Sequence, residues 1–295
     1  MGNNFENNRE QKEEPKFNFG GVDCYGIEAS EIKLPDDMPK EGELVSTDYI
    51  DNKLIPFIED QVKNNKYYKV KRVKYSVGNK ILLIVDVSDD EFEKYFENVE
   101  KSEKPADLSE NNKKLFYEWE KEVERAWQLE IDDPNNYEEN YKEVNRVEGK
   151  IRRTLEENPN LVNNIKEVIK TVGDNLDLAL FLCHWTPKDD ADLVKLLDRF
   201  ILNPDSENRN NASRSILYNY THTLDQIDIH KFLKQMQLPF HTDRNKALYV
   251  LEAYSKDPKY KEELLQFKDY FIKLSKAKMP NIVQPVEVIL KNINS

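Results

Sequence analysis

The chain has 295 residues, of which 38% are hydrophobic and 34% are charged, and its formal net charge is −12. The hydrophobic share is low and the charged share is high for a globular domain, so we expect a thin core and an extended architecture rather than a compact globule. The acidic balance argues against a dedicated DNA coat, and the content of only 8 glycines argues against Gly-rich phosphate loops.

Targeting and redox features are few. The two cysteines, Cys24 and Cys183, are far apart in the sequence and predict neither a disulfide framework nor a zinc site. The chain opens on a polar stretch without an apolar leader, and no run approaches the roughly 18 apolar residues that a membrane-spanning helix needs. We therefore expect free thiols, no association with a membrane and a cytoplasmic location.

The N-terminal part predicts a small α+β domain. Residues 1–20 are rich in Asn, Glu and Lys and are expected to form a disordered tail, and residues 21–104 are expected to form the domain. A Gly78-Asn79 turn predicts an antiparallel hairpin. The expected order is helix, strand, strand and helix, at about 46–63, 67–77, 80–87 and 89–102.

Both helices of this domain carry signals for their N-terminal ends. Ser46 or Thr47 can cap the first helix, and Asp89 or Asp90 can cap the second. Pro56 is expected to bend the first helix, because it has no backbone N–H to donate.

From residue 105 onward nothing resembles a strand. Residues 105–137 are expected to form a connecting helix that places Trp119 and Trp127 in the core. Residues 138–295 are expected to form an array of helices joined by short turns. The helices of the array are predicted at about 138–157, 161–171, 174–184, 189–201, 207–221, 228–236, 242–255, 259–276 and 281–293.

Two segments of the array repeat one pattern. The Arg-Asn-x-Ala stretches at 209–212 and 244–247 are 35 residues apart, and aligning them also aligns two prolines. The matched positions are Pro204 with Pro239, Arg209 with Arg244 and Ala212 with Ala247. Periods of about 20–50 residues are typical of solenoids, in which no unit buries its apolar face alone. The repeat therefore predicts stacked pairs of helices.

This pattern resembles the HEAT repeat, in which an apolar helix and an Asp/Asn-Pro turn precede a second helix that carries Arg and Ala. The tetratricopeptide repeat, at about 34 residues, is closer in length than the HEAT repeat, at about 40–47, but its Trp, Leu-Gly and Tyr pattern is absent. The resemblance implies that Arg and acidic residues link neighbouring units and that small alanines let helices approach. The structural repeat positions are Pro204, Ala212, Pro239, Asp243 and Ala247.

The C-terminal part is mildly basic, with 14 Lys and Arg against 10 Asp and Glu from residue 206 to the end. Solenoids present concave surfaces to other proteins, so the sequence favours a non-catalytic, cytoplasmic scaffold or adaptor that binds another protein. We assign it no cofactor, metal ion or catalytic residue, while enzymatic activity stays open. The candidate binding residues are Arg209, Arg214, Arg244, Lys246 and Tyr249.

Two other functions stay open. The basic face allows a nucleic-acid-binding HEAT-like protein, similar to the repair glycosylases built on such repeats. Asp86, Asp89 and Asp90 follow an apolar strand, a position where nucleases often hold a metal ion, and the partner strand carries lysines. The simpler interpretation is that the last two aspartates cap the next helix and that the lysines guard a sheet edge.

The histidines and Cys183 favour structural roles. The four histidines lack the spacing of converging metal ligands, and we expect them at the surface or between helices. Cys183 lies in an apolar stretch directly before His184 and is expected to be a buried structural thiol.

Overall fold

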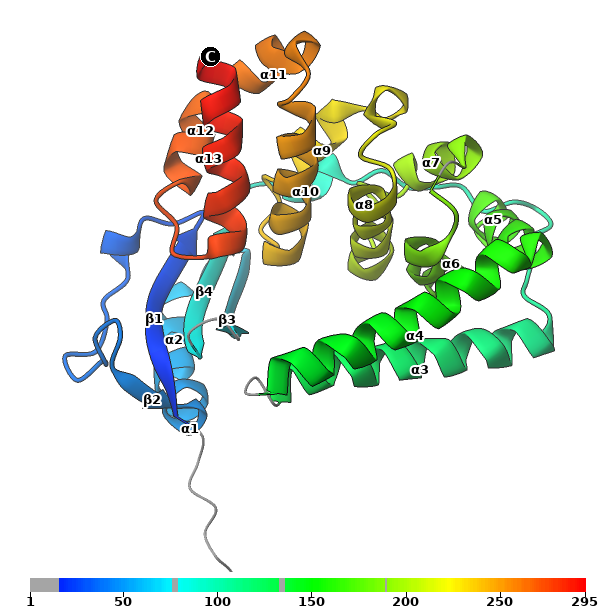
Figure 1. Ribbon diagram of the computed structural model, residues 1–295. Helices are drawn as coiled ribbons and strands as arrows, with labels where there is room; N and C mark the ends of the chain where they lie inside the picture. The colour runs from blue at the N-terminus through cyan, green and yellow to red at the C-terminus, as the bar shows by residue number, and fades with distance from the viewer. Residues whose placement is uncertain (1–15, 76–78, 133–135, 189) are drawn as a thin grey trace, which may run out of the picture.

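A four-stranded sheet and a curved row of helices make up the structure (Figure 1). The computed structural model describes residues 16–75, 79–132, 136–188 and 190–295. The predicted fold class, a small α+β part followed by a mostly helical part, is confirmed.

The sheet contains more strands than the predicted hairpin. Its order is β2-β1-β4-β3, and the strands are β1 (Lys16–Tyr25), β2 (Leu44–Ser46), β3 (Tyr67–Tyr75) and β4 (Lys80–Ser88). β3 and β4 form the predicted antiparallel pair, and Gly78 of the predicted turn lies outside the described residues. β1 is parallel to β4 and antiparallel to β2, so β2 and β3 are the edge strands of the sheet.

β1 corrects the expected boundary of the N-terminal tail. The strand begins at Lys16, so residues 16–20 belong to the sheet, and residues 1–15 lie outside the described part. The pairing of β1 with β4 shifts at two adjacent glycines, of which Gly21 has a φ of 99°. This irregularity interrupts the alternation of apolar and polar residues by which a strand is recognised in a sequence.

A helical segment follows β2 and covers one face of the sheet. It consists of α1 (Thr47–Tyr49), a π-helical turn (Ile50–Leu54) and α2 (Ile55–Val62). The side-chain oxygen of Ser46 accepts a hydrogen bond from the backbone N–H of Tyr49 at 3.2 Å, which confirms the predicted cap. Pro56 stands in the first turn of α2, directly after the π-helical turn, where its missing N–H interrupts the regular ladder of hydrogen bonds.

The helix expected at about 89–102 does not form, and this part of the chain holds a single 3₁₀ turn, Phe92–Tyr95. Phe92 packs edge-on against Phe96 at a ring distance of 6.0 Å and against Phe240 at 5.6 Å. Phe240 belongs to the helical part of the chain. Contacts made across the fold therefore override the local helical pattern.

The helices of the C-terminal part lie close to their predicted positions, except that the one expected at about 259–276 is two helices. The first ones are α3 (Glu110–Asp132), α4 (Tyr137–Glu157), α5 (Pro159–Thr171), α6 (Leu176–Leu182), which a 3₁₀ turn, Cys183–Trp185, extends, and α7 (Ala191–Asp198). The others are α8 (Ser206–Asn219), α9 (Ile229–Gln235), α10 (His241–Tyr254), α11 (Lys261–Leu265), α12 (Lys268–Leu274) and α13 (Pro280–Asn294).

The helices form a curved row with a long hairpin beneath it. α3 and α4 make this hairpin, which runs back beneath α6 and α8 toward the sheet (Figure 1). The pairs α7–α8 and α9–α10 occupy the two aligned segments, with Pro204 and Pro239 in the turns inside each pair. α8 packs against α10, and α10 packs against α13. The inner face of α6, α8 and α10 thus looks toward the hairpin.

One hydrophobic core joins the sheet to the helices. The sheet residues in this core are Tyr25, Leu82 and Ile84, whereas residues on the opposite face of the sheet pack with α2. At the end of β1 the carboxylate of Asp23 accepts hydrogen bonds from the backbone N–H groups of Lys278 at 2.7 Å and Met279 at 2.9 Å, where α13 begins. The boundary expected near residue 104 therefore divides the sequence but not the core.

Leucine at either repeat alanine is expected to lower the free energy of unfolding by about 1–3 kcal/mol. Ala212 of α8 and Ala247 of α10 are fully buried, and the two helices pack against each other, so a larger side chain must displace its neighbours. Urea unfolding of Ala212→Leu and Ala247→Leu measures the effect, with the exposed Ala191 of α7 changed to Leu as the control. Two core variants as stable as the wild type would show that the alignment of the segments is wrong.

Candidate binding groove

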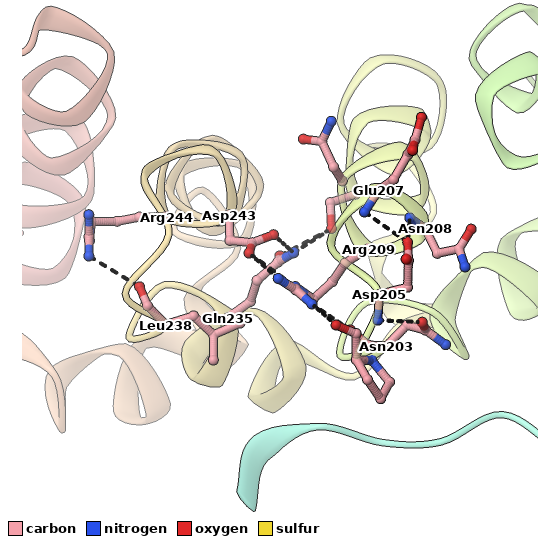
Figure 2. Close-up of polar contacts among 12 residues, drawn as sticks. Asn203, Asp205, Glu207, Asn208, Arg209, Gln235, Leu238, Asp243 and Arg244 are labelled. Carbon is pink, nitrogen blue, oxygen red and sulfur yellow. Dashed lines mark hydrogen bonds and ion pairs between the residues drawn. The ribbon is translucent and has the colours of Figure 1, made fainter. Parts of the chain in front are cut away.

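Arg209 links α8 to the neighbouring helices. Its Nε and Nη2 donate hydrogen bonds to one carboxylate oxygen of Asp243 in α10, at 3.0 and 2.8 Å. Its Nη1 donates to the carbonyl oxygens of Asn203 and Pro204, at 2.6 and 3.0 Å. Figure 2 shows the side chains of Arg209 and Asp243 pointing toward each other, with Gln235 of α9 on the same carboxylate. The network ties three helices to one turn.

Aromatic rings complete the enclosure of Arg209. Its guanidinium lies 4.9 Å from the ring centre of Phe96 and 5.0 Å from that of Phe240. Burial raises the pKa of Asp243, and the positive charge of Arg209 opposes that rise. Because Arg209 is fully buried, no part of its guanidinium is open to a ligand, which corrects its assignment as a binding residue.

Arg244 makes the equivalent link between the helices and the sheet. Its Nη1 donates a hydrogen bond to Asp86 of β4 at 2.9 Å, and its Nη2 donates to the carbonyl oxygen of Leu238 at 3.1 Å. The guanidinium lies 4.0 Å from the ring centre of Tyr25 in β1. Both charged side chains are only 2% exposed, so Arg244 is likewise not available as a binding residue.

Asp86 and Asp89, two of the aspartates considered as metal ligands, have partners in the structure. Arg244 engages the carboxylate of Asp86, and Asp89 accepts a hydrogen bond from the backbone N–H of Lys66 at 3.1 Å rather than capping a helix. No group of three or more His, Cys, Asp or Glu side chains that could hold a metal ion occurs in the described part of the chain. Asp86 and Asp89 thus hold the end of β4 to α10 and to the start of β3.

The other three predicted binding residues lie where a ligand can reach them. Arg214 of α8 and Lys246 and Tyr249 of α10 are all half-buried. Lys246 donates a hydrogen bond to the side-chain oxygen of Asn210 in α8. Burial raises the pKa of Tyr249, with smaller contributions from Glu252 and Tyr218. These residues form part of a larger surface on the inner face of the helices.

We define the cationic belt as Lys71, Arg152, Arg214 and Lys246, which come from β3, α4, α8 and α10. Burial, with repulsion from Arg214 and Lys71, lowers the pKa of Lys246 to about 8. Burial, with repulsion from Arg214 and Arg152, lowers the pKa of His184 to about 3. Because these charges lower the pKa values of Lys246 and His184, the cations lie near these two residues. Among the described residues, no carboxylate forms an ion pair with any of the four.

A cavity of about 440 Å³ lies at the α4 end of the cationic belt. We call it the Trp127 cavity, and its lining residues are Trp127, Glu148, Arg152, His184, Lys188, Arg214 and Tyr218. The Arg214 guanidinium lies 4.9 Å from the ring centre of Trp127, whose Nε1 donates a hydrogen bond to Glu148 at 3.1 Å. Tyr218, which is 62% exposed, packs edge-on against His184 at 4.8 Å.

We call the inner face of α6, α8 and α10, together with the facing side of the α3–α4 hairpin, the groove; it also has acidic residues. Burial raises the pKa of Glu120 in α3, and the charges of Glu124, Asp177 and Glu207 raise it further. Asp177 and Glu207 lie in the first turns of α6 and α8, whereas Arg214 lies further along α8. The inner face is therefore negative near the start of these helices and positive along the belt.

The remaining predictions have mixed outcomes. Trp119 is buried in the core as expected, but Trp127 is only half-buried and lines the cavity. Cys183 is fully buried and its pKa is raised by burial, as expected of a structural thiol. His184 and His241 are buried between elements. Sequence reasoning missed Lys71, Arg152 and His184 as groove residues, because no local pattern connects them.

No helix in the described part of the chain is both long and apolar enough to cross a lipid bilayer. Neither a family model, nor a curated protein, nor a solved structure matches the sequence. The assignment of the helix pairs to the HEAT family therefore stays a prediction, and function has to be argued from the groove.

Proposed function

We propose that this chain is a non-catalytic, cytoplasmic protein-binding module, and that its groove holds an acidic segment of a partner protein against the cationic belt. The four belt cations carry the proposal, since none of them forms an ion pair with a carboxylate in the described part of the chain. Free thiols at Cys24 and Cys183 support a reducing compartment. A scaffold or adaptor of this kind needs only a shaped surface of suitable charge.

The belt differs from the other inward-facing cations of the molecule. Arg209 and Arg244 are paired with buried aspartates, and Lys166 and Lys231 are paired with half-buried ones. Among the described residues none of the four belt cations forms an ion pair with a carboxylate, although Glu148 and Glu207 attract Arg214 and Asp243 attracts Lys246 from further away. Arg214 and Lys71 repel Lys246. An acidic segment that docks on them relieves this repulsion, which makes electrostatic complementarity a source of both binding rate and specificity.

The residues beside the belt suit a polypeptide. Trp127, Tyr218 and Tyr249 offer aromatic surface of the kind that is enriched at protein interfaces. The acidic side of the groove around Glu120 would repel a phosphate backbone that ran along its whole length. A protein segment can place basic or neutral residues there, so a protein partner is favoured over a nucleic acid.

Replacing three belt cations by glutamine is expected to abolish capture of the partner. The variant Lys71→Gln/Arg214→Gln/Lys246→Gln removes the charges and keeps most of the apolar stems. The measurement is affinity capture from nuclease-treated lysate, with cross-linking to identify which groove residues touch the captured protein. The matched control is Arg153→Gln/Lys195→Gln/Lys256→Gln, which removes three exposed cations outside the groove.

The proposal predicts a discrete protein that the wild type and the control retain, that the belt variant loses, and that cross-links to groove residues. Equal capture by the belt variant and the control would contradict it. The alternative result is that the wild type recovers nucleic acid from a sample without nuclease treatment. If high salt and the belt variant both abolish that recovery, the nucleic-acid alternative replaces the proposal of a protein partner.

A further inference from the structure

The Trp127 cavity is lined by more cations than carboxylates, and four elements build it. Trp127 comes from α3, Arg152 from α4, His184 from the 3₁₀ turn after α6 and Arg214 from α8. The chain holds the turn firmly: Asn219 donates hydrogen bonds to the carbonyl oxygens of Cys183 at 3.0 Å and His184 at 2.7 Å. The cavity is therefore a built feature of the fold.

The polar groups of the cavity have unused hydrogen-bonding capacity. His184 is only 7% exposed, and its Nδ1 has no hydrogen-bond partner among the described residues. Arg214 stacks on Trp127 but forms no ion pair within the described structure. Stacking on an aromatic face leaves the N–H groups at the edge of a guanidinium free to bind an oxyanion. The Nδ1 atom is itself enclosed, so the groups that an anion in the cavity can reach are the edge of the Arg214 guanidinium and the exposed ammonium of Lys188.

The charges of the cavity match a doubly charged anion. Arg152, Lys188 and Arg214 are positive and Glu148 is negative, which leaves a net charge of +2. The imidazole of His184 stays neutral, because burial lowers its pKa to about 3, and so it adds no charge to the cavity. A phosphate monoester carries about −1.5 to −2 charges at neutral pH and accepts several hydrogen bonds, which suits an arginine pair better than a single carboxylate does.

We infer that the Trp127 cavity is a subsite for one phosphate monoester, carried by a phosphorylated side chain of the acidic partner segment. The source of the phosphate, a partner protein, rests on the proposed function. The affinity of the pocket for a phosphate group does not. Phosphorylation of the partner would then control its docking, with the belt holding the acidic flanks and the cavity holding the phosphate.

The test compares three probes at constant ionic strength. They are an acidic peptide with one central phosphoserine, the same peptide with serine, and a single-stranded oligonucleotide. Fluorescence anisotropy of the labelled probes gives the affinities. Inorganic phosphate is titrated separately, while NMR follows the imidazole of His184 and the indole N–H of Trp127. The variants His184→Phe and Lys188→Gln change the cavity alone, Lys71→Gln/Lys246→Gln changes the belt alone, and Arg153→Gln is the exposed control on α4.

The expected result is that the phosphopeptide binds about tenfold more tightly than the serine peptide, which corresponds to about 1.4 kcal/mol. Both cavity variants should remove this advantage, the belt variant should weaken both peptides, and Arg153→Gln should change neither. Inorganic phosphate should shift the signals of His184 and Trp127. Thermal unfolding of each variant confirms that it is folded, and Lys188→Gln at an exposed position keeps the test valid if His184→Phe is unstable.

Other outcomes separate the two proposals. If both peptides bind equally and the cavity variants change nothing, the phosphate subsite is wrong and the acidic-segment function stands. If inorganic phosphate shifts the cavity signals but neither peptide binds, the pocket takes phosphate and the proposed protein-binding function fails. If the oligonucleotide binds more tightly than the phosphopeptide and the cavity variants reduce its binding, the phosphate source is a nucleic acid and the inference about a phosphorylated partner is overturned.

Discussion

Asp86→Ala is expected to lower the free energy of unfolding by about 3–5 kcal/mol, because it leaves the buried charge of Arg244 without its counter-ion. The two side chains join β4 to α10 at 2.9 Å and are 2% exposed. No group in the described part of the chain accepts a hydrogen bond from Nε of Arg244, so the loss of the carboxylate leaves most of the guanidinium donors unsatisfied. Chemical unfolding followed by tryptophan fluorescence and by far-ultraviolet circular dichroism measures the effect.

The double variant Asp86→Leu/Arg244→Met should recover most of this loss, because a buried ion pair can be replaced by apolar residues of similar size at little cost. The matched control is Asp51→Ala, which removes the half-exposed partner of Arg72 and should cost only about 0–1 kcal/mol. The two spectroscopic signals should change together, since the sheet and the helices share a core. If Asp86→Ala lowered the free energy of unfolding by less than about 1 kcal/mol, the ion pair would add little to the attachment of the sheet to the helices.

Acidification from pH 7 to pH 5 is expected to destabilise the protein by about 2 kcal/mol for each of two buried histidines, or about 4 kcal/mol together. Burial lowers the pKa of His184 and of His241 from 6.5 to about 3. A histidine whose pKa is depressed on folding binds its proton more weakly in the folded state than in the unfolded state. Its contribution to stability is therefore complete above about pH 6.5 and is lost as the pH falls from there toward about 3.

Nearby groups set the size of this effect. The positive charges of Lys71, Arg244 and Lys246 disfavour the protonated form of His241. They therefore lower its pKa further than burial alone does. Asp23 and Asp243 act in the opposite direction, because burial raises their pKa values. Comparison of variants separates the contributions.

Urea unfolding of His184→Phe and of His241→Phe at several pH values is the measurement. Each variant should lose about 2 kcal/mol of the difference in stability between pH 7 and pH 5. His230→Gln changes an exposed histidine and should keep the dependence of the wild type. If the pH dependence of both phenylalanine variants equals that of the wild type, the buried histidines are not the source of the acid sensitivity.

Local signals were sufficient for most elements. Ser46 caps the first helix where its side chain was expected to do so, and most C-terminal helices lie close to their predicted ranges. The first failure is β1, where a shift in pairing at adjacent glycines hides the strand pattern. The second is the helix expected at about 89–102, where Phe92 packs against Phe240 instead. In both places a contact with a distant segment outweighs the local pattern.

The groove could be predicted only in part. Arg214, Lys246 and Tyr249 were chosen as candidates in the mildly basic C-terminal part, and all three are half-buried. The same choice included Arg209 and Arg244, whose partners Asp243 and Asp86 lie 34 and 158 residues away in the sequence. An arginine in a surface groove and an arginine in a buried ion pair share the same local pattern, so the sequence cannot separate them.

The sequence by itself determined the fold class, the positions of most helices, the β3–β4 hairpin and the excess of acidic charge, since capping residues, turns and apolar periodicity act over a few residues. The tertiary structure alone decided which cations are paired and which form the cationic belt. It also decided that His184 and Trp127 meet in one cavity. Burial and charge pairing depend on distances between segments far apart in the chain, and these distances exist only after the hairpin of α3 and α4 has folded beneath the row of helices.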